Sequence, residues 1–368
     1  MVLRLLPNDR TLSVLQGEFS ILGFDVLAVV VARRMRDGAL RYLFGAAIAL
    51  LATVQPISLW NYSILTESFT ISANALALAA WIGLKDRWAI VPALGLVCAF
   101  GVFIRDSEIV VFCLLAVAVV VVGVIGRSRQ WPSYVAAALV IVLSLAAFVL
   151  ESQTKRDTVY LRDVLAVRIF PFRDRVAWFS AHGMPDAALI NSLADATPKV
   201  VGQAKVVSYD RGSPNFHSLN LWLSVSGTRT YAEFLLLHPS YVLLEPFSSP
   251  PQIFNNASGS VRFYAPAHQR VPRLLDDLLF PRGPILAIAA LLIGALIASR
   301  DRTDRVAWYQ SLVLLLMSGV VSLLVWHADG QEAARHTLES NLLGRLAVIM
   351  ALAALAGTAS DPSAEIAT

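Results

Sequence analysis

The feature that most constrains this chain is a series of nine apolar stretches, each about 16 to 22 residues long, separated by charged breaks. A helix needs roughly 20 apolar residues to cross a bilayer, and a backbone in lipid must satisfy its hydrogen bonds within that helix. We therefore predict an all-α polytopic membrane protein with about nine transmembrane helices. The predicted spans are residues 12–33, 39–56, 67–84, 88–104, 109–126, 134–150, 284–299, 306–326 and 341–357.

The composition favours the same class. Hydrophobic residues make up 57% of the 368 positions and charged residues 15%, whereas roughly a quarter of the residues in soluble domains are charged. The net charge is +4, but the basic residues gather at the ends of apolar stretches, so no nucleic-acid partner is expected. Cys98 and Cys113 fall inside predicted spans, and we interpret them as packing residues.

The charged breaks also predict an orientation, because short loops rich in arginine and lysine stay in the cytoplasm. Alternate breaks hold eleven such residues, whereas the short loops between them hold only two, Arg105 and Arg335. The eleven are Arg33, Arg34, Arg36, Arg41, Lys85, Arg87, Arg127, Arg129, Arg300, Arg302 and Arg305. The C-terminus is therefore predicted to be cytoplasmic and the long loop extracytoplasmic. Residues 1–11 would then also lie outside, although they contain no signal peptide.

The spans divide the chain into four predicted regions. These are a membrane bundle of about six spans at 1–150, an extracytoplasmic loop region at 151–283, three further spans at 284–357 and a cytoplasmic tail at 358–368. The loop region is polar enough to form a folded outer domain or a set of helices lying on the membrane. Its arginines at 168, 173 and 175 stand among aromatic residues, a pattern that suits a segment at the lipid headgroups or a surface stretch without substrate contact.

Five short passages resemble elements of one family when they are taken in order. They are WNYSILTESF at 60–69, FGVFIRDSE at 100–108, WFSAHGMP at 178–185, HPSYV at 238–242 and HADGQEAARHTLESNLLGR at 327–345. Together they resemble bacterial membrane glycosyltransferases of the GT-C superfamily, which are relatives of dolichyl-phosphate-mannose protein mannosyltransferases. The resemblance implies a GT-C-like fold in the bacterial inner membrane. It also implies a polyprenyl-phosphate sugar as donor and an extracytoplasmic glycan, lipid or protein as acceptor.

In that family a first span leads into an outer loop that bears a catalytic acid, and the next span begins much as Leu12 does here. Either the first span of this chain inserts with its N-terminus outward, or an upstream span has been lost through a misplaced start; the resemblance favours the second, with the family's first span and most of its first loop missing from the chain as given. Asp9 is a poor match for the acid. The chain would then lack the usual catalytic residue, and its activity as given is open.

Candidate site residues come from the outward ends of the spans. Arg105 suits a phosphate clamp because a guanidinium can make paired contacts to phosphate, although it could equally be a snorkelling arginine paired with Asp106 or Glu108. Glu67 stands in the first turn of a predicted span. It could orient the acceptor as a catalytic acid or simply stabilise the helix start. Glu18, seven residues before Asp25, could line the acceptor cleft, since acids at membrane depth usually face a bundle interior.

A second group of candidates begins at Asp329. On a helix starting there, Glu332, Arg335, His336 and Glu339 would share one face. We predict Asp329 and Glu332 as catalytic acids and Arg335 and His336 as substrate-binding residues. A divalent metal on Asp329, Glu332 and His336 is chemically possible, so no cofactor is assigned. The alternative is a solvated helix start with internal ion pairs.

Three classes of function are compatible with these sequence features. The first is a membrane glycosyltransferase that uses an acid as general base and stabilises the leaving phosphate electrostatically. The second is a non-catalytic or truncated membrane subunit that binds lipid carriers. The third is a transporter, in which Glu18 and Asp25 within the first span would form a proton pathway. A transporter should also show paired broken spans in two halves, and the sequence does not show these.

Overall fold

The computed structural model describes residues 9–35, 38–62, 66–84, 87–105, 107–125, 131–152, 157–195, 216–248, 273–280, 294, 305–329 and 336–358. Every regular element in this part of the chain is a helix, and none is a strand. The predicted all-α class is therefore confirmed.

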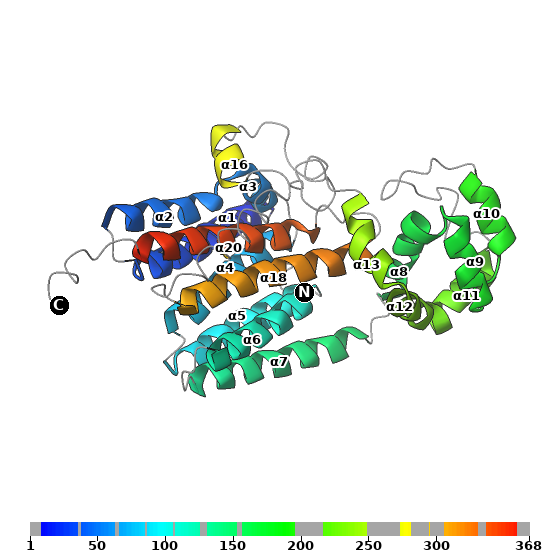
Figure 1. The fold of residues 1–368 in the computed structure, drawn as a ribbon, viewed down its shortest axis with the longest axis horizontal. Coiled ribbons are helices and arrows are strands. Elements are labelled where there is room, and N and C mark those ends of the chain that lie inside the picture. Colours follow the sequence, from blue (N-terminus) through cyan, green and yellow to red (C-terminus); the bar gives the residue numbers. More distant parts are fainter. Residues whose placement is uncertain are drawn as a thin grey trace. The chain divides into compact units, whose positions relative to one another are not determined.

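The chain forms two compact units. Unit 1 comprises Met1–Val149, Asn256–Val321 and Leu338–Thr368, and unit 2 comprises Leu150–Asn255 and Ser322–Thr337. The helices that contribute to unit 1 are α1 (Asp9–Ala32), α2 (Gly38–Leu51), α3 (Gln55–Tyr62), α4 (Glu67–Leu84), α5 (Ile90–Ile104), α6 (Glu108–Ile125), α7 (Trp131–Ser152), α16 (Arg273–Leu279), α18 (Arg305–Ala328) and α20 (Leu338–Thr358). In Figure 1 the long helices of this unit run side by side.

Among the described residues, five helices are long and apolar enough to cross a membrane. They are Arg10–Ala32, Glu67–Leu84, Glu108–Ile125, Trp131–Glu151 and Trp308–Ala328. The pair α2 and α3 bends by 47° and raises this number to six if it is one broken span. The chain is thus a helical membrane protein, and the count of nine spans stays a prediction. The predicted span at 284–299 lies outside the described residues except for Gly294.

One predicted span boundary is wrong. The stretch 39–56 is not a single helix, because α2 ends at Leu51 and α3 begins at Gln55. Pro56 explains the break, since proline lacks the N–H that a continuing helix needs but is well tolerated in a first turn. The predicted outward loop at 57–66 consequently contains most of α3.

Small residues bring α1 and α4 close together. A Cβ added to Gly23 of α1 would lie only 2.9 Å from the backbone oxygen of Ser72 in α4, so only glycine fits this crossing without a shift. Close backbone approach through small side chains is typical of helix packing in membranes. Deeper in unit 1, large side chains such as Trp60, Trp81 and Phe112 are fully buried.

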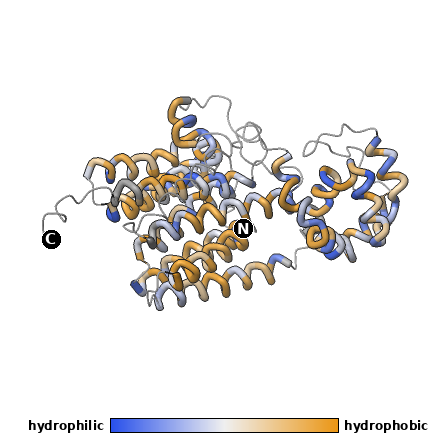
Figure 2. Tube along the Cα trace, in the orientation of Figure 1, coloured by the Kyte–Doolittle hydropathy of each residue, from blue (hydrophilic) through white to orange (hydrophobic). Residues whose placement is uncertain are grey.

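Unit 2 is a small helical unit with a hydrophobic core of its own. Its elements are α8 (Asp157–Val164), η2 (Leu165–Ile169), α9 (Arg173–Ala181), α10 (Ala187–Asp195), α11 (His217–Trp222), η4 (Leu223–Gly227), α12 (Thr228–Leu237), α13 (Pro239–Leu244) and η5 (Glu245–Ser248). Figure 2 shows that polar and apolar residues are more evenly mixed in these elements than in the helices of unit 1.

The aromatic residues around Arg168 belong to this core. Phe170 and Phe179 are buried together with Arg168 itself. These aromatic residues therefore do not form the exposed apolar face that a segment lying at the lipid headgroups would need. Of the interpretations left open for the loop region, a folded unit fits these residues best. Gly183, in the passage WFSAHGMP, has φ of +90° in the turn that follows α9, a conformation that favours glycine.

Candidate functional site

The candidate site in unit 1 is a cluster of charged side chains at helix ends. Glu67 is the first residue of α4, Glu108 is the first residue of α6, and Glu339 stands in the first turn of α20. Arg105 caps the C-terminal end of α5, where its backbone N–H donates to the oxygen of Gly101. Three helix starts and one helix end therefore contribute the four charged groups, which we call the Arg105 cluster.

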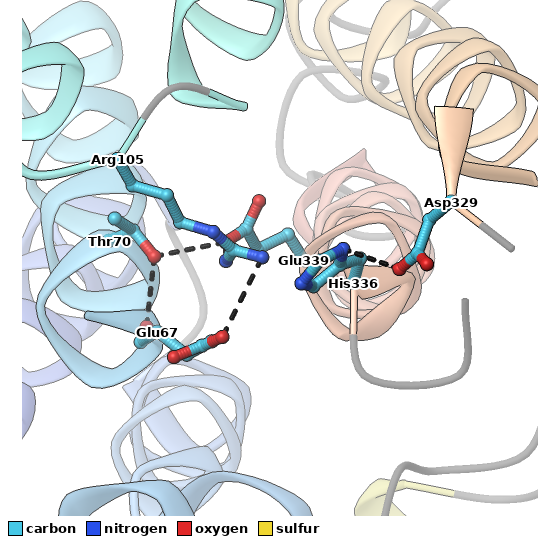
Figure 3. Close-up of polar contacts among 6 residues, drawn as sticks. All are labelled: Glu67, Thr70, Arg105, Asp329, His336 and Glu339. Atoms are coloured by element: carbon cyan, nitrogen blue, oxygen red, sulfur yellow. Dashed lines mark hydrogen bonds and ion pairs between the residues drawn. The ribbon is translucent and has the colours of Figure 1, made fainter. Parts of the chain in front are cut away.

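Arg105 holds two of the carboxylates (Figure 3). Its Nη1 donates to Oε1 of Glu339, and its Nη2 lies 3.8 Å from Oε1 of Glu67. The Arg105 side chain is 10% exposed and each glutamate side chain 3%. Of the two acids considered as partners of a snorkelling arginine, Glu108 also interacts electrostatically with Arg105, and Asp106 lies outside the described residues. The ion pairs are thus shielded from water, and each matters more than a surface pair would.

Thr70 links the two glutamates. Its hydroxyl lies 2.9 Å from Oε1 of Glu339 and 3.0 Å from the backbone oxygen of Glu67. A hydroxyl has one hydrogen, so it donates to only one of these oxygens at a time. The Thr70 contact therefore orients the Glu339 carboxylate while Arg105 neutralises it.

The cluster carries more negative than positive groups. Glu108 is fully buried and interacts electrostatically with Glu339 and Arg105. Among the residues that the structure describes here, three carboxyl groups thus face one guanidinium. The positive ends of α4, α6 and α20 offset part of this charge.

The candidate residues in unit 2 form a separate pair. Nδ1 of His336 lies 2.7 Å from Oδ2 of Asp329, as Figure 3 also shows, and both side chains are largely buried. Nη2 of Arg168 donates to the backbone oxygen of Asp329 at 2.7 Å, and its guanidinium lies 3.8 Å from the centre of the Trp326 ring. Burial lowers the pKa of Arg168, and Glu245 and Asp329 act against that shift.

The remaining predicted site residues either lie outside the described part of the chain or occupy positions other than those expected. Glu332 and Arg335 lie outside the described residues, so their roles stay predictions. The expected helix face from Asp329 onward is not continuous, because Thr337 forms a turn and α20 begins at Leu338. Glu18 and Asp25 are exposed and do not face the interior of the bundle.

The structure brings Glu67 and Arg105 together, and it brings Asp329 and His336 together. The convergence of these two pairs on one outer cavity stays a prediction. In the part of the chain that the structure describes, no three His, Cys, Asp or Glu residues are grouped as a metal site would require. The metal site considered for Asp329, Glu332 and His336 includes a residue outside that part.

Sequence reasoning missed two members of the cluster and the threonine that contacts them. Glu339 was expected only as part of a helix face, Glu108 only as a neighbour of Arg105, and Thr70 not at all. A signal for the two acids exists, because each stands in the first turn of an apolar helix, at an end that the charged breaks predict to face outward. Their contact with Arg105 joins residues up to 234 positions apart, which no local pattern reveals.

No protein-family model, curated protein or solved structure matches this chain. The fold and the buried cluster together define a helical membrane protein with a buried group of charged side chains at one end of its helices.

Proposed function

We propose that this protein is a membrane glycosyltransferase that transfers sugar from a polyprenyl-phosphate donor to an extracytoplasmic acceptor. The observation that supports this proposal most is the buried contact of Arg105 with Glu67 and Glu339, which residues from three separate apolar helices create. Burial of charge in a membrane protein is costly and usually marks a functional site. The resemblance of the passages around Glu67, Arg105 and Glu339 to the GT-C superfamily supplies the reaction class.

Glu67 is the better general base of the two glutamates. Glu339 is held by both Arg105 and Thr70, whereas the Glu67 oxygen lies 3.8 Å from the guanidinium. We therefore assign the base to Glu67, the carboxylate at the longer of these two contacts with Arg105. In the proposed step, an acceptor hydroxyl attacks the anomeric carbon, its proton moves to Glu67, and the bond to the leaving polyprenyl phosphate breaks with inversion.

In this scheme Arg105 is chiefly a positioning residue. Its guanidinium already contacts two carboxylates, which compete with a substrate phosphate for the same N–H groups. The phosphate contact predicted for Arg105 would require one of these contacts to open. Arg335 and His336 stay the predicted substrate-binding residues, with Asp329 and Glu332 as further predicted acids.

The test is donor turnover by the purified protein in nanodiscs. Polyprenyl-phosphate hexoses and pentoses labelled in the sugar are supplied, and the released polyprenyl phosphate is measured. Glu67→Gln should lower the rate by at least about 100-fold, the usual contribution of a general base. Asp277→Asn serves as the control, because Asp277 is an exposed acid in α16.

Wild-type protein that consumes none of these donors, while binding one of them, would favour the non-catalytic lipid-carrier subunit instead. Equal turnover by wild type and Glu67→Gln would refute the assignment of the base.

One observation favours a transporter as the second candidate. The 47° bend between α2 and α3 resembles the broken helices on which transporters build their sites. Proteoliposomes that acidify or alkalise their lumen in response to an imposed gradient, with a loss of this response in Glu67→Gln and no donor turnover, would select this alternative.

A further inference from the structure

Two of the sequence passages that carry no assigned role meet at one pocket in unit 2. The pocket has a volume of about 610 Å³, within the range of roughly 300 to 1,000 Å³ that is typical of small-molecule sites. Trp178 comes from the passage WFSAHGMP, and His238 and Tyr241 come from HPSYV. All three side chains line the pocket, together with Asp174, Arg175 and Glu245.

Aromatic rings form one wall of the pocket. The Trp178 ring stacks on His182 with their centres 3.8 Å apart, and it contacts His238 edge to face at 5.6 Å. Phe234 also lines the pocket, with its ring centre 5.1 Å from that of Trp178 and 5.0 Å from that of Tyr241. The rings support one another, so the wall is preorganised and does not have to be ordered by a ligand.

Arg175 and Glu245 form the polar side. Their ion pair joins Nη1 to Oε1, and the guanidinium is sandwiched between the rings of Phe172 and Tyr241, 4.1 and 4.6 Å from their centres. Glu245 is buried, with a side chain 5% exposed. Asp174, in the first turn of α9, is exposed at the same pocket.

The charges of this pocket select among ligands. Two carboxylates outnumber one guanidinium that is already paired, so an anion such as a phosphate would be repelled. A cation would meet Arg175, which already occupies the face of the Tyr241 ring where a cation could bind. Carboxylates, a phenol and imidazole suit hydroxyl groups as partners, and burial raises the pKa of Tyr241, so its phenol keeps the proton it would donate.

We propose that this pocket binds a neutral glycan, with the aromatic wall facing the apolar side of a sugar ring and Asp174 and Glu245 accepting from its hydroxyls. The proposal concerns unit 2 alone and needs no transfer reaction. If the proposed transferase activity holds, the pocket narrows the acceptor from a glycan, lipid or protein to a neutral glycan. Failure of glycan binding would not imply failure of the proposed transferase activity, or the reverse, because binding is measured without a donor.

The experiment uses the full chain in nanodiscs and saturation-transfer NMR with four free trisaccharides. Two are neutral, maltotriose and cellotriose; one is anionic, a trimer of galacturonic acid; and one is cationic, a trimer of glucosamine. At least one neutral trisaccharide should bind, and both charged ones should bind at least about 10-fold more weakly, the change expected from one lost charge-assisted contact.

Variants then locate the binding. Trp178→Ala and Asp174→Asn should each weaken binding of the neutral trisaccharide about 10-fold. Trp131→Ala should leave it unchanged, because Trp131 is 65% exposed at the start of α7 and lies outside the pocket. The proposal is overturned if no neutral trisaccharide binds at about 10 mM or if a charged trisaccharide binds as tightly as the neutral one. It is also overturned if the two pocket variants bind the neutral trisaccharide like wild type.

Discussion

Removal of the Arg105 side chain should be among the most damaging single substitutions in unit 1. Arg105→Ala deletes the close contact to Glu339 and the 3.8 Å contact to Glu67, both largely buried. Breaking a buried ion pair by removing one partner costs about 3 to 5 kcal/mol. The cost arises because the buried carboxylates of Glu67 and Glu339 then lose the guanidinium that they contact. We expect a loss of about 4 kcal/mol in the free energy of unfolding.

Two further variants separate the electrostatic cause from a loss of packing. Arg105→Ala combined with Glu339→Gln removes one of the uncompensated charges, so it should recover about 1 to 2 kcal/mol relative to Arg105→Ala alone. Arg173→Ala is the matched control. Arg173 also forms an ion pair, with Asp195, but the two side chains are 63% and 44% exposed, and exposed pairs contribute little.

The assay is reversible unfolding in mixed micelles, followed by tryptophan fluorescence. Trp60 and Trp81 are buried in unit 1 and report on its packing. The reasoning is refuted if Arg105→Ala unfolds like wild type. It is also refuted if Glu339→Gln adds to the damage of Arg105→Ala, since the second substitution should relieve repulsion and not remove a stabilising charge.

Three further predictions test other parts of the structure. Gly23→Ala should destabilise unit 1 by about 1 to 3 kcal/mol through overpacking, whereas Gly17→Ala, where an added Cβ meets nothing within 4 Å, should be neutral or slightly stabilising; similar unfolding curves would contradict the close crossing of α1 and α4. Ser213→Cys, in a protein without the two native cysteines, should react with an impermeant maleimide in intact cells, and labelling only after lysis would reverse the predicted orientation. Arg168→Ala should cost about 3 kcal/mol through the lost contacts to Trp326 and the backbone, measured as faster hydrogen exchange in unit 2, and unchanged exchange would contradict it.

The lengths of the apolar stretches predicted the long helices well, because side chains that face lipid and side chains that face the bundle interior are both apolar. Helix α4 occupies the predicted residues 67–84, since a charged residue marks each of its ends. Prediction failed where the chain stays apolar but changes direction. Residues 52–54 are apolar or small, yet α2 stops before them, and the relevant signal was Pro56 two positions later. Hydropathy averaged over a window cannot register such a break, whereas backbone hydrogen bonding can.

The candidate site was predictable in kind but not in composition. A lone arginine in an outward loop and an acid at a helix start identified Arg105 and Glu67, because charge at a membrane end needs a partner. Which acid supplies that partner depends on how α5 and α20 pack, and the resulting contact spans 234 positions. Unit 2 was harder still. Its arginines and aromatics have the composition of a surface segment, and only the fold shows that Arg168 stacks on Trp326 inside a core.

Helix α1 is where composition and packing disagree most. It is about 36 Å long, and its buried side includes Gln16, Ser20 and Phe24, whereas Glu18 and Asp25 lie on its exposed side. Each acid stands about 10 Å or more from the nearer helix end, and an acid at such depth costs about 2.5 to 3.5 kcal/mol against hydrocarbon. Lipid alone therefore does not suit this side of α1, and polar groups or water must meet it. A functional role has to be sought there as well as at the Arg105 cluster, because the two carboxylates add cost without adding to the packing of unit 1.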